Sequence, residues 1–145
     1  MTVNPVFASV GRFFGREPIY KVPKYQRSYA WDKLEIEDFV KDVEICFQKR
    51  KANRTQQGNH FFGGIVSVEQ QISGAVDNSE FELVDGQQRM ATFVILISAV
   101  IARYKELLVQ VKASSDTANE KLIERRIEEL GARFIEFDQE VNRRT

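Results

Sequence analysis

Cysteine and histidine are nearly absent from this chain of 145 residues, which contains one of each. The single cysteine, Cys46, has no second cysteine with which to form an intramolecular disulfide or a cysteine-rich zinc site. The single histidine, His60, cannot supply the two histidines of an H-x-x-x-H zinc motif. The sequence therefore excludes the zinc centres that depend on several cysteines or histidines.

Two further features are missing, an excess of charge and a long apolar run. The chain has 21 Lys and Arg residues against 21 Asp and Glu residues, so its formal net charge is zero. A neutral chain has no overall field that attracts nucleic acid, and any DNA contact must come from a local basic patch. No apolar run approaches the roughly 20 residues that span a bilayer, and the N-terminus has no signal-peptide pattern. We expect a soluble cytoplasmic protein with no membrane partner.

What is present is a hydrophobic content of 43%, with eleven Phe residues. The pattern predicts an α+β fold in which helices pack a small mixed sheet, in the order α-β-α-β-β-α-α. The stretch from Phe93 to Ile101 is apolar around most of a helix, so we expect it to be buried. The expected helices cover residues 4–14, 32–51, 92–111 and 117–141, and the expected strands cover 19–22, 60–69 and 81–84.

Helix starts are marked by capping residues. Asn4 is a candidate N-cap, and two capping boxes are expected, one of Asp32 with Glu35 and one of Thr117 with Glu120. The last helix carries an apolar seam that must pack on this domain or on a partner. Its members, spaced four and three apart, are Ile123, Ile127, Leu130, Phe134, Phe137 and Val141.

A polar turn lies between the third expected strand and the long apolar helix. It reads Asp85-Gly86-Gln87-Gln88-Arg89, followed by Thr92. Gly86 allows a close approach of the backbone to a ligand, the helix start favours an anion, and Arg89 can bind phosphate oxygens. Asp85 could hold a divalent ion or a water. The alternative is a plain connection in which Asp85 caps the helix and Arg89 forms an internal ion pair.

Another polar loop, called the first loop because it comes earlier in the chain, follows the first expected strand. It contains Lys24, Tyr25, Gln26 and Arg27 and ends at Trp31, a mixture suited to a phosphate or a base. If the first and third strands are neighbours in the sheet, both loops leave the same or adjoining edges of it, and a Gln-Arg pair in each loop would then line one cleft. The alternative is a surface loop whose aromatic residues pack inward while its cations face water.

The segments 22–31, 61–66 and 83–92 together resemble the N-terminal domain of the GmrSD family of modification-dependent restriction proteins. The Gly63-Gly64 pair in the second segment indicates a bulge or a close approach by another backbone or a ligand. The resemblance implies a ParB/sulfiredoxin-like fold over most of the chain. It also implies a nucleotide-binding, NTP-hydrolysing domain of an anti-phage defence system, with a nucleoside triphosphate and Mg²⁺ as cofactors.

The same resemblance assigns roles to the residues of both loops. A catalytic role is expected for Asp85, which is also the candidate metal ligand, and for Gln87, Gln88 and Arg89. Nucleotide binding is expected for Gly86, Arg89, Thr92, Arg27 and Gln26. Sensing of DNA or of its modification is expected for Lys24, Tyr25, Gln26 and Arg27.

Members of this family usually continue into a helical region and often an HNH-type nuclease. With one histidine, this chain is not expected to cut DNA by an HNH route on its own. We expect a nucleotide-site domain over residues 1–112 and a C-terminal helix over 113–145 that leads to a helical or nuclease region in the same or another chain. The alternatives are a non-catalytic module that recognises modified DNA and a fragment that is inactive without its nuclease partner.

Overall fold

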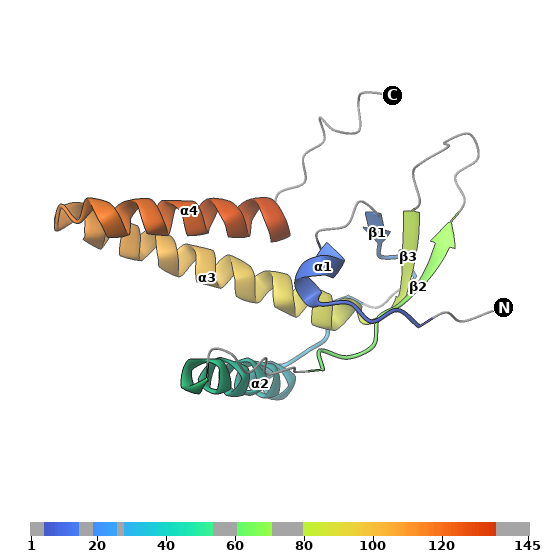
Figure 1. Ribbon diagram of the computed structural model, residues 1–145. Helices are drawn as coiled ribbons and strands as arrows, with labels where there is room; N and C mark the ends of the chain where they lie inside the picture. The colour runs from blue at the N-terminus through green and yellow to red at the C-terminus, as the bar shows by residue number, and fades with distance from the viewer. Residues whose placement is uncertain (1–4, 15–18, 26–27, 54–60, 71–79, 136–145) are drawn as a thin grey trace, which may run out of the picture. The chain divides into compact units, whose positions relative to one another are not determined.

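The computed structural model describes residues 5–14, 19–25, 28–53, 61–70 and 80–135. These contain four helices and a mixed sheet of three strands in the predicted order α-β-α-β-β-α-α, so the α+β class is confirmed (Figure 1). The chain divides into two compact units, Pro18–Thr92 (the sheet unit) and Met1–Glu17 with Phe93–Thr145 (the helical unit). The domain boundary expected near residue 112 stays a prediction, because contacts alone do not show which parts fold independently.

The sheet unit is organised around its central strand. The strand order is β1 (Ile19–Lys21), β3 (Glu80–Asp85) and β2 (Val66–Gln70). β1 pairs with β3 in parallel, and β2 pairs with β3 in antiparallel. Leu83 of β3 is only 2% exposed and is the one buried hydrophobic side chain among the described residues. The centre of the sheet therefore holds the small core of this unit.

Helix α2 (Lys33–Ala52) also belongs to the sheet unit. It begins as predicted, because the Asp32 carboxylate accepts a hydrogen bond from the Leu34 N–H and the Glu35 carboxylate accepts one from the Asp32 N–H. These two bonds form the predicted capping box and satisfy N–H groups that have no partner within the helix. A hydrogen bond between the Asp32 and Glu35 side chains, together with the one that Asp32 accepts from the Leu34 N–H, keeps the pKa of Asp32 below its ordinary value.

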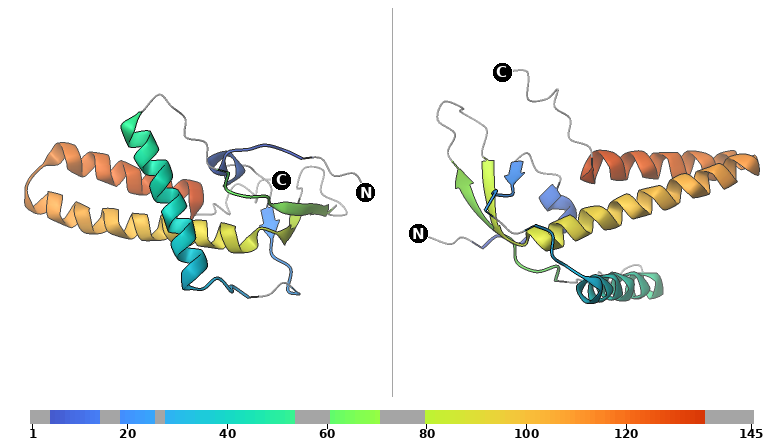
Figure 2. Two further views of the ribbon diagram at one scale, coloured as in Figure 1. Left: turned by 90° about the horizontal axis from the view of Figure 1, so that it is seen from below. Right: turned by 180° about the vertical axis from the view of Figure 1, so that it is seen from behind.

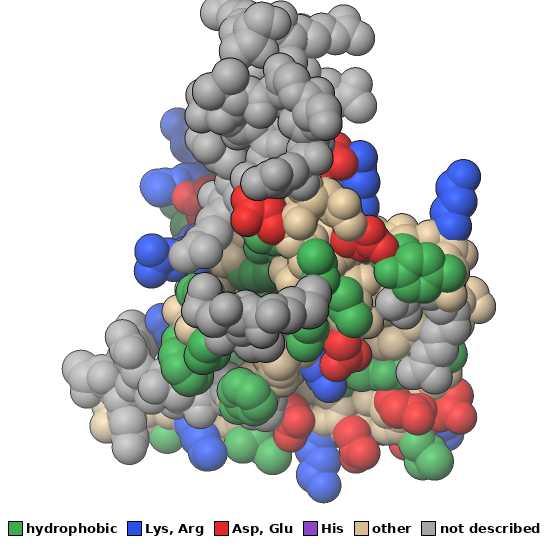
Figure 3. Space-filling view, turned by 90° about the vertical axis from the view of Figure 1, so that its right-hand side faces the viewer, with side chains coloured by type: hydrophobic (Ala, Val, Ile, Leu, Met, Phe, Trp, Pro, Cys, Tyr) green, Lys and Arg blue, Asp and Glu red, His purple; other side chains and the backbone are tan. Residues whose placement is uncertain are grey.

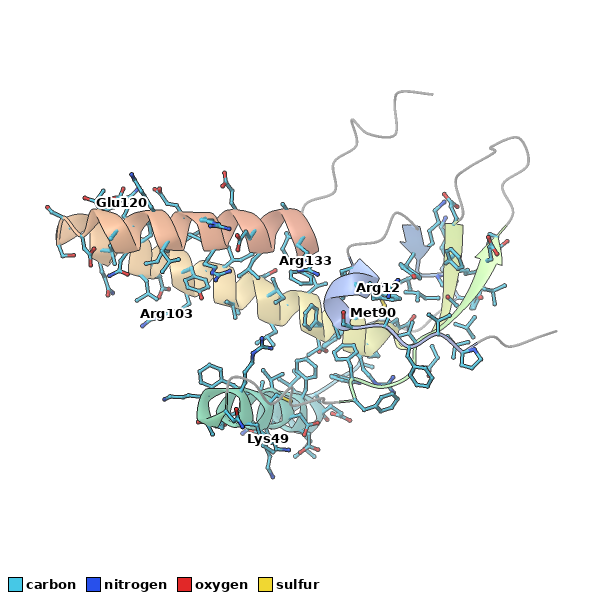
Figure 4. All side chains as sticks on the ribbon, in the orientation of Figure 1. Arg12, Lys49, Met90, Arg103, Glu120 and Arg133 are labelled. Carbon is cyan, nitrogen blue, oxygen red and sulfur yellow. The ribbon has the colours of Figure 1, made fainter. Side chains whose placement is uncertain are left out.

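The helical unit contains α1 (Val10–Phe14), most of α3 (Gln87–Ala113) and α4 (Thr117–Phe134). Helices α3 and α4 lie side by side as an antiparallel hairpin in all views (Figures 1 and 2). The rings of Phe14, Phe93 and Phe134 form a cluster with centroid separations of 5.3 to 5.8 Å. Arg133 donates hydrogen bonds to the Gly11 carbonyl, which holds the end of α4 against α1 (Figure 4).

The seam predicted on the last helix is confirmed over its described part. Ile123, Ile127, Leu130 and Phe134 are half-buried, while most residues between them are exposed. Lys112 at the end of α3 forms ion pairs with Glu120 and Glu124 of α4, so the two helices are joined by charges at the turn end as well. The outer seam positions, Phe137 and Val141, lie outside the described residues.

The apolar stretch of α3 is more accessible than its composition predicts. Ile95 is 56% exposed and Val100 is 37% exposed, so the expected burial of Phe93 to Ile101 is wrong. A helix packed on one neighbour covers only one side of its circumference, and apolar residues elsewhere on it remain accessible. Figure 3 shows one face of the molecule, on which hydrophobic side chains are interspersed among acidic and basic ones.

The starts of α1 and α4 differ from the prediction. Helix α1 begins at Val10 rather than near Asn4, because the Ser9 hydroxyl and carbonyl accept hydrogen bonds from N–H groups of the first turn. Asn4 itself lies outside the described residues. Helix α4 is capped by Asp116 rather than Thr117, since the Asp116 carboxylate accepts from the Asn119 N–H and side-chain amide. Asp and Ser are strong N-cap residues, and in both cases the polar residue nearest the helix takes that role.

None of the helices within the described residues is long and apolar enough to cross a membrane.

Candidate functional site

The polar turn is a direct passage from strand to helix. β3 ends at Asp85 and α3 begins at Gln87, which leaves Gly86 as the only residue between them. The helix was expected to start at Thr92, but the Gly86 carbonyl already accepts the first helical hydrogen bond, from the Met90 N–H at 3.1 Å. The last three residues of the expected turn, Gln87 to Arg89, therefore form the first turn of α3.

Gly86 is the residue that makes this passage possible. Its φ is +96°, a conformation that side chains rarely tolerate. A Cβ at this position would lie 3.0 Å from the Ile65 side chain and 3.2 Å from the Gly64 carbonyl oxygen. Gly86 therefore brings the start of α3 close to the segment that precedes β2.

The parallel pairing of β1 with β3 places both polar loops at one edge of the sheet. Ile19, Tyr20 and Lys21 pair with Glu80, Phe81 and Glu82, so the carboxyl ends of the two strands point the same way. The conditional prediction that the two loops share an edge is thereby confirmed. The Tyr25 hydroxyl donates a hydrogen bond of 2.5 Å to Glu82, and this bond raises the pKa of the Tyr25 phenol.

Gln88 and Thr92 join the first loop to α3. The Gln88 side chain is 8% exposed; its oxygen accepts from the Ala30 N–H at 2.8 Å, and its nitrogen donates to the Ser28 carbonyl at 3.3 Å. Thr92 is 5% exposed, and its hydroxyl lies 2.9 Å from the Tyr29 hydroxyl. These are the two buried polar side chains of the described residues, and both are satisfied by hydrogen bonds.

Arg89 lies against the Gly63-Gly64 pair. Its Nη1 donates a hydrogen bond of 2.7 Å to the Gly64 carbonyl oxygen. A Cβ at Gly63 would lie 2.8 to 2.9 Å from three guanidinium atoms, and Gly63 has a φ of +115°. A close approach at this pair is present, but the group that approaches Gly63 is the Arg89 side chain rather than the backbone or ligand that we predicted. The expected strand over 60–69 starts only at Val66, because Gly63 turns the backbone out of the extended conformation.

A concavity of about 140 Å³ lies at the junction of β3 and α3. Asp85 is exposed there, and Gln87 and Arg89 are half-buried. Within the described parts of the chain there is no group of three His, Cys, Asp or Glu residues that could hold a metal ion. Its lining consists of Trp31, Val84, Asp85, Gly86, Gln87, Gln88 and Arg89.

The structure brings the predicted residues of the turn Asp85–Arg89 together in one concavity, and it places the other described candidate residues outside it. Asp85 through Arg89 all line the concavity, whereas Thr92 faces the first loop through Tyr29. Lys24 and Tyr25 are exposed beside β3, and Gln26 and Arg27 lie outside the described residues.

Sequence reasoning overlooked two contributors. Trp31 lines the concavity, and Gly63 contacts Arg89. The available signals were the position of Trp31 at the end of the polar loop and the Gly-Gly pair, which indicated a close approach by a backbone or a ligand but not by an arginine side chain.

Comparison with known protein families identifies this chain by a match over most of its length. The family model described as GmrSD restriction endonuclease, N-terminal domain, matches residues 10–144. This range covers nearly the whole chain, including the first loop, the Gly63-Gly64 pair and the turn from Asp85 to Arg89. Among curated proteins, no match was found.

Proposed function

The chain belongs to the family of GmrSD restriction endonuclease N-terminal domains, and we propose that its β3–α3 junction binds the phosphates of a nucleoside triphosphate and supports their hydrolysis. Membership places the chain in the N-terminal region of a restriction protein. The observation that carries the proposal is the concavity in which the turn Asp85–Arg89 opens a long helix. The ParB/sulfiredoxin-like fold that we expected is part of this proposal.

Phosphate binding is assigned to the start of α3 and to Arg89. The first N–H groups of a helix have no partner within it, and the helix dipole favours an anion at that end. Gly86 has no side chain to keep a phosphate away from these groups. A guanidinium has five N–H donors, and the bond from Nη1 to the Gly64 carbonyl fixes the orientation of the group that would meet the phosphate.

Hydrolysis needs a positioned water as well as a phosphate site. We assign the orientation of that water to Gln87, which lines the concavity. Gln88 was expected to share this role, but its amide bonds to the backbone of the first loop at Ser28 and Ala30. In this proposal Gln88 positions the loop, and Thr92 acts with it through Tyr29 rather than on the nucleotide.

Magnesium fits this arrangement through Asp85. Nucleotide-bound Mg²⁺ takes one or two protein carboxylates and completes its shell with phosphate oxygens and water. Asp85 is exposed at the end of β3 and supplies one such carboxylate. When bound, the ion would neutralise charge on the phosphates.

The test is thermal unfolding with ATP, GTP, CTP and UTP, each with and without Mg²⁺, combined with release of inorganic phosphate. A ligand that binds only the folded chain raises the melting temperature as its concentration rises. Arg89→Gln should abolish most of this shift. Arg103→Gln is the matched control, because Arg103 lies on the same helix in an exposed ion pair with Glu106 (Figure 4). Equal shifts in wild type and Arg89→Gln would contradict the proposal.

DNA is the second candidate ligand, and the exposed first loop favours it. Tyr25 is 75% exposed and stands next to the exposed Lys24, which gives an aromatic face and a cation. Binding of DNA through the first loop should weaken steeply with salt, as counterion release requires.

The proposed partner is a nuclease region in the same or another chain, in a cytoplasmic restriction system.

A further inference from the structure

The only tryptophan of the chain, Trp31, lies in the wall of the concavity. It ends the first polar loop and directly precedes Asp32, the N-cap of α2. Its side chain is half-buried. A large aromatic ring therefore lies next to the polar residues proposed to bind phosphate.

The position of this ring is fixed from two sides. On the loop side, the N–H of the preceding residue, Ala30, donates to the buried Gln88 side chain at 2.8 Å. On the helix side, the Trp31 ring lies 6.1 Å from the ring of Phe39, which contacts Phe62 at the same separation. A ring held in this way is a preformed surface, and a ligand would not have to order it.

The concavity is lined by both polar and apolar side chains. Asp85, Gln87 and Arg89 supply its polar part, while Trp31 and Val84 supply its apolar part. Its volume of about 140 Å³ is below the roughly 300 to 1,000 Å³ of a pocket that encloses a whole small molecule. A ligand bound here would be enclosed at one end and would extend over the rim.

We propose that Trp31 contacts the nucleoside part of the nucleotide and stacks on its base, while the start of α3 and Arg89 bind the phosphates. This inference rests on the proposed function and names the residue that distinguishes a nucleotide from a bare polyphosphate. Stacking of a base on an aromatic side chain contributes about tenfold or more in affinity. The alternative for a half-buried tryptophan is packing alone, which predicts no dependence on the base.

A single tryptophan makes the test direct, because the intrinsic fluorescence of the full chain reports on this position. The chain is titrated with each of the four nucleoside triphosphates and with inorganic tripolyphosphate, and thermal shifts are recorded in parallel. We expect the nucleotides to quench Trp31 fluorescence. Tripolyphosphate should raise the melting temperature with much less quenching.

The variants separate stacking from packing. Trp31→Leu should lose about tenfold or more in affinity for nucleotides and keep its affinity for tripolyphosphate, while Trp31→Phe should retain most of the nucleotide affinity. Phe47→Leu on α2 is the control for an aromatic side chain outside the concavity, since Phe47 is 62% exposed. Circular dichroism establishes that each variant is folded. If Trp31→Leu does not fold, quenching in the wild type and the affinity of Trp31→Phe carry the test.

Three outcomes overturn the inference. If Trp31→Leu binds nucleotides as tightly as the wild type and still binds tripolyphosphate, the stacking role is contradicted while the phosphate site still stands. If none of these ligands raises the melting temperature, neither the stacking role nor the phosphate site is supported. Quenching by a single-stranded oligonucleotide without quenching by any free nucleotide assigns Trp31 to nucleic acid instead.

Discussion

The interactions within the β3–α3 junction differ in kind from those within the α3–α4 hairpin. At the junction, buried amide and hydroxyl groups of Gln88 and Thr92 bond to a loop, and two glycines with positive φ allow close contacts. In the hairpin, half-buried apolar side chains and exposed ion pairs join two helices. Hydrogen bonds and glycine contacts depend on exact atomic positions, whereas apolar packing tolerates changes of similar volume. Substitutions should therefore affect ligand binding at the junction and stability in the hairpin.

The largest effect is expected from Gly63→Ala. The added Cβ would displace the Arg89 guanidinium from the Gly64 carbonyl and would strain a backbone with a φ of +115°. A guanidinium moved from this position would lose a charge-assisted hydrogen bond to phosphate, which corresponds to about a tenfold to hundredfold loss of phosphate affinity. The measurement is calorimetric or thermal-shift titration with tripolyphosphate.

Gly64→Ala is the matched control for this substitution. A Cβ at Gly64 meets no atom within 4 Å, and its φ is not in the positive range. Affinity should stay near the wild-type value. Similar losses from both alanines would show that the Arg89 contact does not determine binding.

Phe134→Ala should act on the hairpin alone. It removes one of three clustered rings, and half-burial of Phe134 suggests about 2 kcal/mol of lost stability, which is below the cost for a fully buried Phe. Denaturant unfolding followed by circular dichroism measures this loss. Phosphate affinity below the unfolding transition should be unchanged, and a matching loss of affinity would contradict the separation of the two regions.

The smallest effect is expected from Asp116→Asn, at low pH. Hydrogen bonds from the Asn119 side chain and backbone lower the pKa of Asp116 below its ordinary value of 3.8. The contribution of the ionised cap is therefore present above pH 3.8 and is lost as the pH falls through the lower folded value. Asparagine also caps helices but does not titrate. Helicity followed by circular dichroism should fall less steeply below pH 4 in Asp116→Asn, and identical curves would contradict this role.

Sequence reasoning predicted the parts of this fold that depend on local patterns. The order of elements and the capping box of Asp32 with Glu35 follow from residue types and spacing. The sharing of one sheet edge by the two polar loops was predicted only on condition that β1 and β3 are neighbours, and the structure supplies that condition. Burial of Phe93 to Ile101 could not be predicted in the same way. Apolar composition favours burial, but burial also requires a neighbour on each side of the helix, and periodicity does not count neighbours.

The candidate site shows a similar limit. The turn from Asp85 to Arg89 was recognised from its polar residues and glycine, but the side chain that contacts Gly63 and the backbone groups that meet Gln88 were not. Those contacts join residues 25 to 60 positions apart in the sequence. A glycine pair indicates that something approaches closely, and only three-dimensional structure shows what does.

Helix α3 contains both the first turn of the candidate site and the whole first arm of the hairpin, without a break between Gln87 and Ala113. At 1.5 Å per residue, such a helix is about 40 Å long. The N–H groups proposed to bind phosphate therefore belong to the same uninterrupted helix as the apolar side chains of the hairpin.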